Sequence, residues 1–303
     1  MFDRRTALIG GTALLLTGAS RPRAVDIAAR VADLGALERR AQGRLGAYVL
    51  DPVRGVRFGW RANERFAHCS SFKMSLAAMI LAKADRKEID PAEVLHWTRA
   101  DMLSVSPVTE TRIDTGLAVE DLAHAIVVTS DNTAANVLLR RFGGPEQLTR
   151  FWRTIGDTVS RLDRYEPELN VTPPGTELDT TTPAAMAATT AALINGKTLS
   201  AVSRAKLKAW MRESRTGRDR IRSGFPAGWD SGDKTGTGIG KTKHTYVDLA
   251  FGGPAGRAPL IVAAYFEPAR LVEPMDPGAT GALAEVGRIA VASLSAVLLQ
   301  VAR

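Results

Sequence analysis

The chain has 303 residues, 45% of them hydrophobic and 24% charged, which is the composition of a folded globular protein and excludes a disordered or fibrous one. Lysine and arginine number 40 against 32 acidic residues, but this excess is scattered without interleaved aromatic residues, so the net charge of +8 indicates a basic surface and no nucleic-acid partner. Cys69 is the single cysteine, which excludes an intrachain disulfide and indicates a packed thiol.

The first twenty residues have the pattern of a cleavable export signal. Arg4 and Arg5 precede an apolar run over residues 7–16, and the small residues 18–20 follow it. The run is shorter than the roughly 20 apolar residues that a membrane span needs. The paired arginines favour the twin-arginine route over the general secretory one. We therefore expect cleavage between residues 20 and 25, and a periplasmic or secreted protein without membrane insertion.

The pattern that follows predicts a helix, a hairpin and then a long helical region. Apolar residues at helical spacing between Ile27 and Leu37 predict a helix that Gly43 ends. Two apolar stretches at 45–50 and 56–60, around a turn with proline and glycine, predict a hairpin. Further helices are expected at 119–128, 133–142, 145–155, 183–194 and 201–211. Residues 161–182 interrupt them with charges and prolines, which predicts a long loop.

After Trp229 the pattern changes to strands. Residues 230–238, 245–251 and 260–266 predict strands, and residues 281–302 predict a final helix. Strands at both ends with helices between them predict an α/β sandwich of the α+β type, in which one antiparallel sheet is built from both chain ends. Residues 26–60 and 215–303 would form this domain, and 61–214, including the 161–179 loop, an inserted all-α domain. The active site is expected in the cleft between the two.

The first motif with chemical potential is Ser70-Ser71-Phe72-Lys73, followed by an apolar helical run. Three residues are close to one helical turn, so Ser70 and Lys73 are expected on one face at the helix start. A neighbouring lysine can take or relay the proton of a serine nucleophile, and the free N–H groups of a first helical turn can stabilise an oxyanion. By itself, such a motif is more often a capped helix with a solvated lysine.

Three more motifs occur in a suggestive order. Ser130-Asp131-Asn132 lies between two predicted helices, Glu166 to Asn170 lie in the long loop, and Lys234-Thr235-Gly236-Thr237 lies on a predicted strand. Each has an ordinary structural explanation alone: a capping turn, a solvated loop charge, an edge-strand lysine before a turn. The combination, at these separations, is far more specific than any one of them.

With these four motifs, the chain resembles the class A serine β-lactamases, within the wider penicillin-recognising group, from about residue 26 onwards. The resemblance implies that Ser70 is acylated by the β-lactam carbonyl and that a carboxylate-bound water then hydrolyses the ester. The implied catalytic residues are Ser70, Lys73, Ser130 and Glu166, and the implied substrate-binding residues are Asn132, Asn170, Lys234, Thr235, Gly236, Thr237, Arg220 and Val105.

The resemblance also implies individual roles. Lys73 or Glu166 takes the proton of the nucleophile, an alternative that is unsettled for the family. Ser130 passes a proton to the lactam nitrogen, and the N–H groups of Ser70 and Thr237 form the oxyanion hole. Asn132 is expected to bind the amide of the substrate side chain, and Lys234, Thr235 and Thr237 its carboxylate.

Other implied features concern the loop and the strand after it. Arg164 and Asp179 are expected to pair across the neck of the loop, and the Glu166–Pro167 bond is expected to be cis. Val105 stands where many relatives carry an aromatic residue. The stretch 239–246 is longer than usual, so Arg220 is the candidate for the family arginine that binds the carboxylate.

Alternative functions are less consistent with the sequence. A penicillin-binding D,D-peptidase or β-lactam sensor shares three of the motifs, but Glu166 with Asn170 favours an enzyme that also deacylates. The glycine-rich stretch 236–242 lacks both the first glycine and the following helix of a phosphate-binding loop. His68, His96, His124 and His244 show no metal-ligand spacing, so we expect neither a metal nor a cofactor. A monomer that acts on a small β-lactam substrate is expected.

Overall fold

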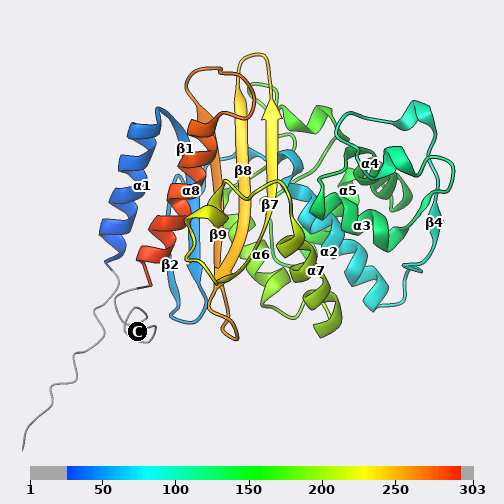
Figure 1. The fold of residues 1–303 in the computed structure, drawn as a ribbon, viewed down its shortest axis with the longest axis horizontal. Coiled ribbons are helices and arrows are strands. Elements are labelled where there is room, and N and C mark those ends of the chain that lie inside the picture. The colour runs from blue at the N-terminus through cyan, green and yellow to red at the C-terminus, as the bar shows by residue number, and fades with distance from the viewer. Residues whose placement is uncertain (1–25, 295–303) are drawn as a thin grey trace, which may run out of the picture.

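A computed structural model describes residues 26–294, in which a five-stranded antiparallel sheet is covered by helices on both faces (Figure 1). The predicted export signal, residues 1–20, lies outside the described residues. Between residues 26 and 294, no helix is long and apolar enough to cross a membrane.

The sheet joins strands from the two ends of the chain, in the order β2-β1-β9-β8-β7. Strand β1 (Gly43–Asp51) pairs with β2 (Val56–Trp60) and with β9 (Leu260–Pro268). Strand β8 (His244–Gly253) pairs with β9 and with the edge strand β7 (Asp230–Ile239). This arrangement confirms the predicted α+β fold with a sheet built from both chain ends.

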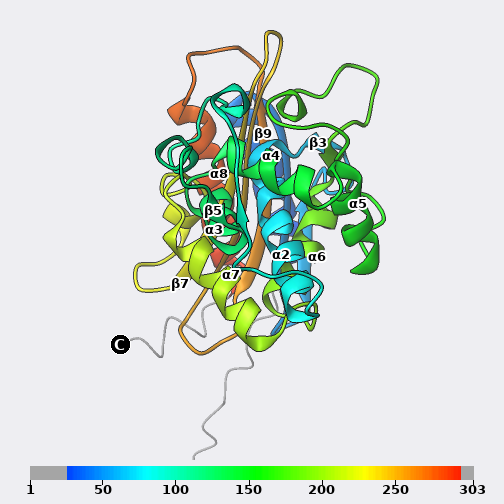
Figure 2. The ribbon, with the colours of Figure 1, turned by 90° about the vertical axis from the view of Figure 1, so that its right-hand side faces the viewer.

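Helices cover the two faces unequally. Helices α1 (Ile27–Ala41) and α8 (Pro277–Ala292) lie on one face, and the helical lobe lies on the other (Figures 1 and 2). The helices of the other face and of the lobe are α2 (Phe72–Asp85), α3 (Val119–Val128), α4 (Asn132–Arg141), α5 (Pro145–Thr154), α6 (Pro183–Ile194) and α7 (Ala201–Glu213). Two short strand pairs, β3 (Phe66–Ala67) with β6 (Thr180–Thr181) and β4 (Val94–Leu95) with β5 (Leu117–Ala118), link loops of this lobe.

The central strands are buried on both faces, which explains their continuous apolar sequence. In β9, Val262 and Ala264 belong to the core beneath α1 and α8, whereas Ile261 and Ala263 belong to the core beneath the helical lobe. Successive side chains of a strand point to opposite faces, so both sets must be apolar when both faces are covered. The sheet is therefore a rigid frame, and its edge strand β7 faces the helical lobe.

Three boundaries differ from the sequence prediction. Ser70 was expected at the start of an α-helix, but Cys69–Ser71 form a 3₁₀ turn (η1) and α2 begins at Phe72. Helix α4 begins at Asn132 because the side chain of Asp131 accepts a hydrogen bond from Ala134 N and caps the helix. The final helix was expected over residues 281–302; α8 runs from Pro277 to Ala292, with Asp276 as its N-cap, and residues 295–302 of the prediction lie outside the described residues.

Candidate active site

The turn that presents Ser70 is held from both sides. The main-chain N–H of His68 donates to the carbonyl of Asp179, 2.9 Å away, and the hydroxyl of Ser71 donates to His68 O at 2.7 Å. The buried His68 ring stacks on Trp152 with 4.8 Å between ring centroids. Ser70 lies on this 3₁₀ turn and Lys73 lies on the first turn of α2, three residues later, so both side chains point to one side.

Ser70, Lys73 and Glu166 form one hydrogen-bonded cluster. Lys73 Nζ lies 2.9 Å from Ser70 Oγ and 2.9 Å from Glu166 Oε1. The hydroxyl of Ser70 donates to Glu166 Oε1 at 3.2 Å. Lys73 and Glu166 are buried, whereas Ser70 is partly exposed. The arrangement therefore gives an accessible hydroxyl two buried neighbours that can take its proton.

The environment of Lys73 favours its neutral form more than water does. Burial lowers the pKa of the ammonium, and the Glu166 carboxylate raises it only in part. The amine also donates to Ser130 O at 2.9 Å and to Asn132 Oδ1 at 2.5 Å. These acceptors fix the amine at one place between the nucleophile and the SDN turn.

The loop that carries Glu166 is ordered by contacts that the sequence motifs did not reveal. Asn136 of α4 donates its side-chain amide to Glu166 O at 2.9 Å and accepts from Glu166 N at 3.0 Å. A buried asparagine within an apolar helix was the available signal, and sequence analysis missed it. The side-chain amide of Asn170 donates to the Glu166 carboxylate, and the Glu166–Pro167 bond is cis.

Arg164 and Asp179 lie together at the neck of the loop. Asp179 is fully buried, and its Oδ2 accepts from Arg164 Nε at 2.6 Å. Its Oδ1 accepts from the main-chain N–H groups of Asp163 and Arg164, at 2.7 and 2.9 Å. One carboxylate therefore closes the loop around Glu166 through both a charge and two main-chain donors.

Ser130 connects the helical lobe to β7. Lys234 Nζ donates to Ser130 Oγ at 3.1 Å and to Thr235 O at 2.7 Å. Burial lowers the pKa of Lys234 to about 7, and the nearby Lys73 charge acts in the same direction. Ser130 adopts a left-handed backbone conformation with φ of 62°, which is unusual outside glycine. A hydroxyl in this position can receive a proton from Lys234.

Strand β7 passes directly over the turn that carries Ser70. A Cβ built on Gly236 would lie 2.8 Å from His68 O and 3.0 Å from Ser70 N, so only glycine fits there. Because β7 is the edge strand, alternate N–H groups of its backbone face away from β8. This places the main chain of Gly236 and Thr237 beside the hydroxyl of Ser70.

Arg220 is buried beneath β7 and β8 and not free in solvent. Its Nη1 donates to Gly236 O at 2.9 Å and to Val247 O at 2.8 Å, and its Nη2 donates to Thr237 Oγ1 at 2.7 Å. Thr235 Oγ1 lies 2.6 Å from Thr216 Oγ1, next to the same strand. The structure therefore brings Arg220 to Thr237, whereas Thr235 contacts Thr216, and the role of Arg220 in carboxylate binding stays a prediction.

Two acids, Asp233 and Asp248, are buried in the sheet near Arg220. Burial raises the pKa of Asp233, and burial together with the Asp233 charge raises the pKa of Asp248 well above its usual value. Arg222 pairs with Asp233 at 2.8 Å. Desolvation therefore disfavours the negative charge on both acids. Sequence analysis did not identify this buried pair.

Asn132 and Val105 lie on the side of the Ser70–Lys73–Glu166 cluster that belongs to the SDN turn. The side-chain amide of Asn132 donates to Ser104 O at 2.8 Å while its oxygen contacts Lys73. Val105 is 63% exposed and has φ of 58°, a strained value for a β-branched residue. Its carbonyl accepts from Asn132 N at 3.0 Å. The strained backbone therefore serves to present the SDN turn, and the Val105 side chain points to solvent.

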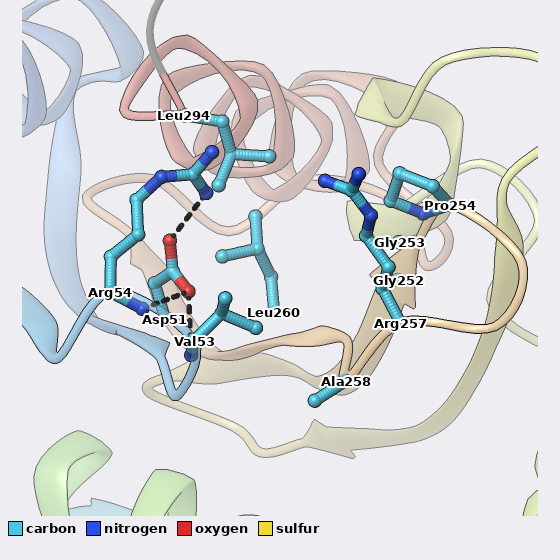
Figure 3. Close-up of a pocket in the computed structure, with 10 residues that line it drawn as sticks. All are labelled: Asp51, Val53, Arg54, Gly252, Gly253, Pro254, Arg257, Ala258, Leu260 and Leu294. Carbon is cyan, nitrogen blue, oxygen red and sulfur yellow. Dashed lines mark hydrogen bonds and ion pairs between the residues drawn. The ribbon is translucent and has the colours of Figure 1, made fainter. Parts of the chain in front are cut away.

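Two further observations concern parts of the molecule outside the four motifs. In residues 26–294, no group of three His, Cys, Asp or Glu side chains could hold a metal ion. Figure 3 shows a small cavity between the β1–β2 turn and the ends of β8 and α8, in which Arg54 pairs with Asp51 at 2.9 Å. None of the motif residues lines this cavity.

Comparison with known proteins places the chain in one family. Residues 27–294 match the Beta-lactamase enzyme family. Beta-lactamase FAR-1 of Nocardia farcinica is 48% identical over 68% of this chain and 66% of that protein. Beta-lactamase AST-1 of Nocardia asteroides is 41% identical over 86% of this chain and 87% of that protein. Beta-lactamase L2 of Stenotrophomonas maltophilia is 42% identical over 90% and 88%.

Solved structures that resemble this chain belong to the same family. The class A β-lactamase reconstructed for the last common ancestor of Gram-negative bacteria (GNCA4) superposes with a TM-score of 0.82 and 45% identity. The superposition covers 88% of this chain and 99% of that chain.

Proposed function

This chain belongs to the class A β-lactamases, and on that premise we infer that it hydrolyses the β-lactam ring through an acyl-serine, a reaction that confers β-lactam resistance. The observation that carries the proposal for its site is the cluster of Ser70, Lys73 and Glu166, with all three functional groups within 3.2 Å of one another. The residue roles below are proposed on this geometry.

Acylation uses the two neighbours of Ser70. Its hydroxyl loses a proton to Glu166 or, through the lowered pKa of its amine, to Lys73 as the oxygen attacks the lactam carbonyl. The N–H groups of Ser70 and Thr237 stabilise the negative charge on the carbonyl oxygen, which the close approach of Gly236 to Ser70 N supports.

Ring opening requires a proton on the lactam nitrogen. Ser130 supplies it, because its hydroxyl accepts a hydrogen bond from Lys234, and its carbonyl accepts one from Lys73. Lys234, whose amine donates to this hydroxyl, can restore the proton that the hydroxyl gives up. Lys73 assists by holding the main chain of Ser130 through the carbonyl.

Substrate binding uses the strand and the SDN turn. The substrate carboxylate is bound by Lys234, Thr235 and Thr237, with Arg220 behind them. The proposal is supported by the buried guanidinium of Arg220, which donates to Thr237 Oγ1. Asn132 binds the amide of the substrate side chain; its own side-chain amide donates to Ser104 O and so is held in place on the SDN turn.

Deacylation distinguishes a hydrolase from a penicillin-binding peptidase or sensor. Glu166 and Asn170 lie beside Ser70 on an ordered loop, and their side chains bond to each other. A water between this carboxylate and the ester is activated as the nucleophile. A protein that only traps β-lactams has no use for such a loop, so the hydrolase is favoured.

The decisive experiment replaces Glu166 by alanine and uses Glu168→Ala as the matched control. Glu168 is an exposed carboxylate two residues away on the same loop. With a penicillin, Glu166→Ala should accumulate an acyl adduct that intact-protein mass spectrometry detects, while kcat falls at least about a hundredfold. The Glu168→Ala variant should keep the parental rate. Parental turnover by Glu166→Ala contradicts the assignment of Glu166 as the base.

The cellular context is also proposed. The pattern of residues 1–20 supports export to the periplasm or the exterior, with the twin-arginine route favoured by Arg4 and Arg5. We expect the mature protein to act as a monomer on small β-lactam substrates. Fractionation of cells that express the full chain, followed by size-exclusion chromatography of the exported protein, tests both points.

A further inference from the structure

The turn between β7 and β8 packs against the loop that carries the deacylating carboxylate. The N–H of Gly240 donates to Lys243 O at 3.0 Å and closes the turn. A Cβ built on Gly240 would lie 3.4 Å from both methyl groups of Val171, and one built on Gly238 would lie 2.2 Å from Asn170 O. The turn and the loop therefore touch at residues adjacent to the proposed water-binding side chain.

A buried carboxylate of the sheet anchors this turn. Lys243 Nζ lies 3.0 Å from Glu267 Oε1, and the Glu267 side chain is only 7% exposed. Arg44 Nε of β1 lies 2.8 Å from Glu267 Oε2, and the hydroxyl of Thr245 donates to Oε1 at 3.4 Å. Glu267 belongs to β9, which has neighbours on both sides, so the anchor is part of the rigid frame.

The other polar side chains of the turn do not anchor it to the sheet. In the described part of the chain, the side chains of Lys241 and Thr242 make no hydrogen bond or ion pair. Lys241 carries the same charge as Lys243 and lies on the same turn, two residues earlier. The turn therefore contains an anchored lysine and an unanchored one.

We propose that Lys243, through its ion pair with Glu267, is a positioning residue for deacylation. The ion pair holds the turn against Val171 and so limits the movement of Asn170, whose amide donates to Glu166. A hydrolytic water must be placed to within a fraction of an ångström to react efficiently. The proposal rests on the proposed roles of Glu166 and Asn170.

The effect is specific to the second half of the reaction. Lys73 and Ser130 are held by buried contacts that do not involve the turn: Lys73 donates to Ser130 O, and Lys234 of β7 donates to Ser130 Oγ. Movement of the turn leaves those contacts in place, so formation of the acyl-enzyme continues at its normal rate. Only the step that depends on the Asn170–Glu166 pair becomes slower.

The test is Lys243→Met, with Lys241→Met as the matched control, in the full protein with a penicillin substrate. Methionine keeps most of the aliphatic stem and removes the charge. We expect kcat and KM to fall together by about three- to fivefold, the factor by which a partly exposed ion pair shifts an equilibrium. The ratio kcat/KM, which reports acylation, should stay within about twofold of its parental value. The steady-state fraction of acyl-enzyme, measured by quenched mass spectrometry, should rise.

One further variant separates positioning from general stability. Lys243→Arg keeps the ion pair and should restore the parental kcat and acyl fraction. A purely structural role would instead reduce the active fraction, lowering kcat at constant KM without added acyl-enzyme. That result, or identical behaviour of Lys243→Met and Lys241→Met, overturns the proposal. A parental protein that neither forms an acyl-serine nor hydrolyses the penicillin refutes the proposed function itself.

Discussion

Replacing Asp179 by asparagine tests whether the neck of the loop positions Glu166. Asp179 is fully buried and accepts from Asp163 N, Arg164 N and Arg164 Nε at 2.7, 2.9 and 2.6 Å. Asparagine can keep one oxygen for the two main-chain donors, but its NH₂ group then faces the guanidinium, donor against donor. The lost charge-assisted hydrogen bond corresponds to about 2–3 kcal/mol.

This magnitude predicts changes in both activity and stability. If about 2 kcal/mol is lost from the closed state of the loop, the ratio of open to closed loop rises roughly thirtyfold. The melting temperature should fall by about 4–8 °C if the whole loss appears in the free energy of unfolding. Penicillin hydrolysis and thermal unfolding, followed by circular dichroism, measure the two effects.

The matched control for Asp179→Asn is Glu177→Gln, in the same loop. Glu177 is exposed and pairs with Arg65 at 3.1 Å, so its loss should shift the melting temperature by less than about 1–2 °C. A double-mutant cycle with Arg164→Ala isolates the coupling between Arg164 and Asp179. If Asp179→Asn melts and turns over like Glu177→Gln, the neck does not hold the loop and the reasoning fails.

Three other predictions follow from the same geometry. Arg220→Ala should raise KM for a penicillin about tenfold, whereas Arg220→Lys should raise it less; unchanged KM and kcat for Arg220→Ala exclude a role in carboxylate binding. Lys234 loses its proton as pH rises through its lowered pKa of about 7, so KM for anionic substrates should increase by up to about tenfold from pH 6 to 8, and Lys234→Arg should flatten this profile. Burial raises the pKa of the Cys69 thiol, so a disulfide reagent at pH 8 should label the unfolded protein and leave the folded one unlabelled; labelling of the folded protein would show that the thiol is accessible.

Much of the fold was predictable because the local pattern determines it. The continuous apolar stretch at 260–266 predicted β9, and the helical spacing between Ile27 and Leu37 predicted α1. Helix boundaries were less accurate. The final helix begins at Pro277 because Asp276 caps it, a local signal that the apolar periodicity after residue 281 concealed.

The candidate site was predictable only as far as its residue types allowed. The motifs identified Ser70, Lys73 and Glu166, but not Asn136, whose two hydrogen bonds hold the Glu166 main chain. Asn136 and Glu166 are 30 residues apart, and no local periodicity connects them. The same holds for the anchor between Lys243 and Glu267, since ion pairs across strands depend on register.

By itself, the sequence determined the class of chemistry and the elements that carry it, because hydrophobic periodicity and motif spacing are local properties of the chain. Only the tertiary structure decided the protonation and position of the reacting groups. Ser70 contacts a carboxylate 96 residues away, and Lys234 contacts a serine 104 residues away. Burial at these junctions lowers the pKa of both lysines, because desolvation acts on a charge only after distant segments have packed around it.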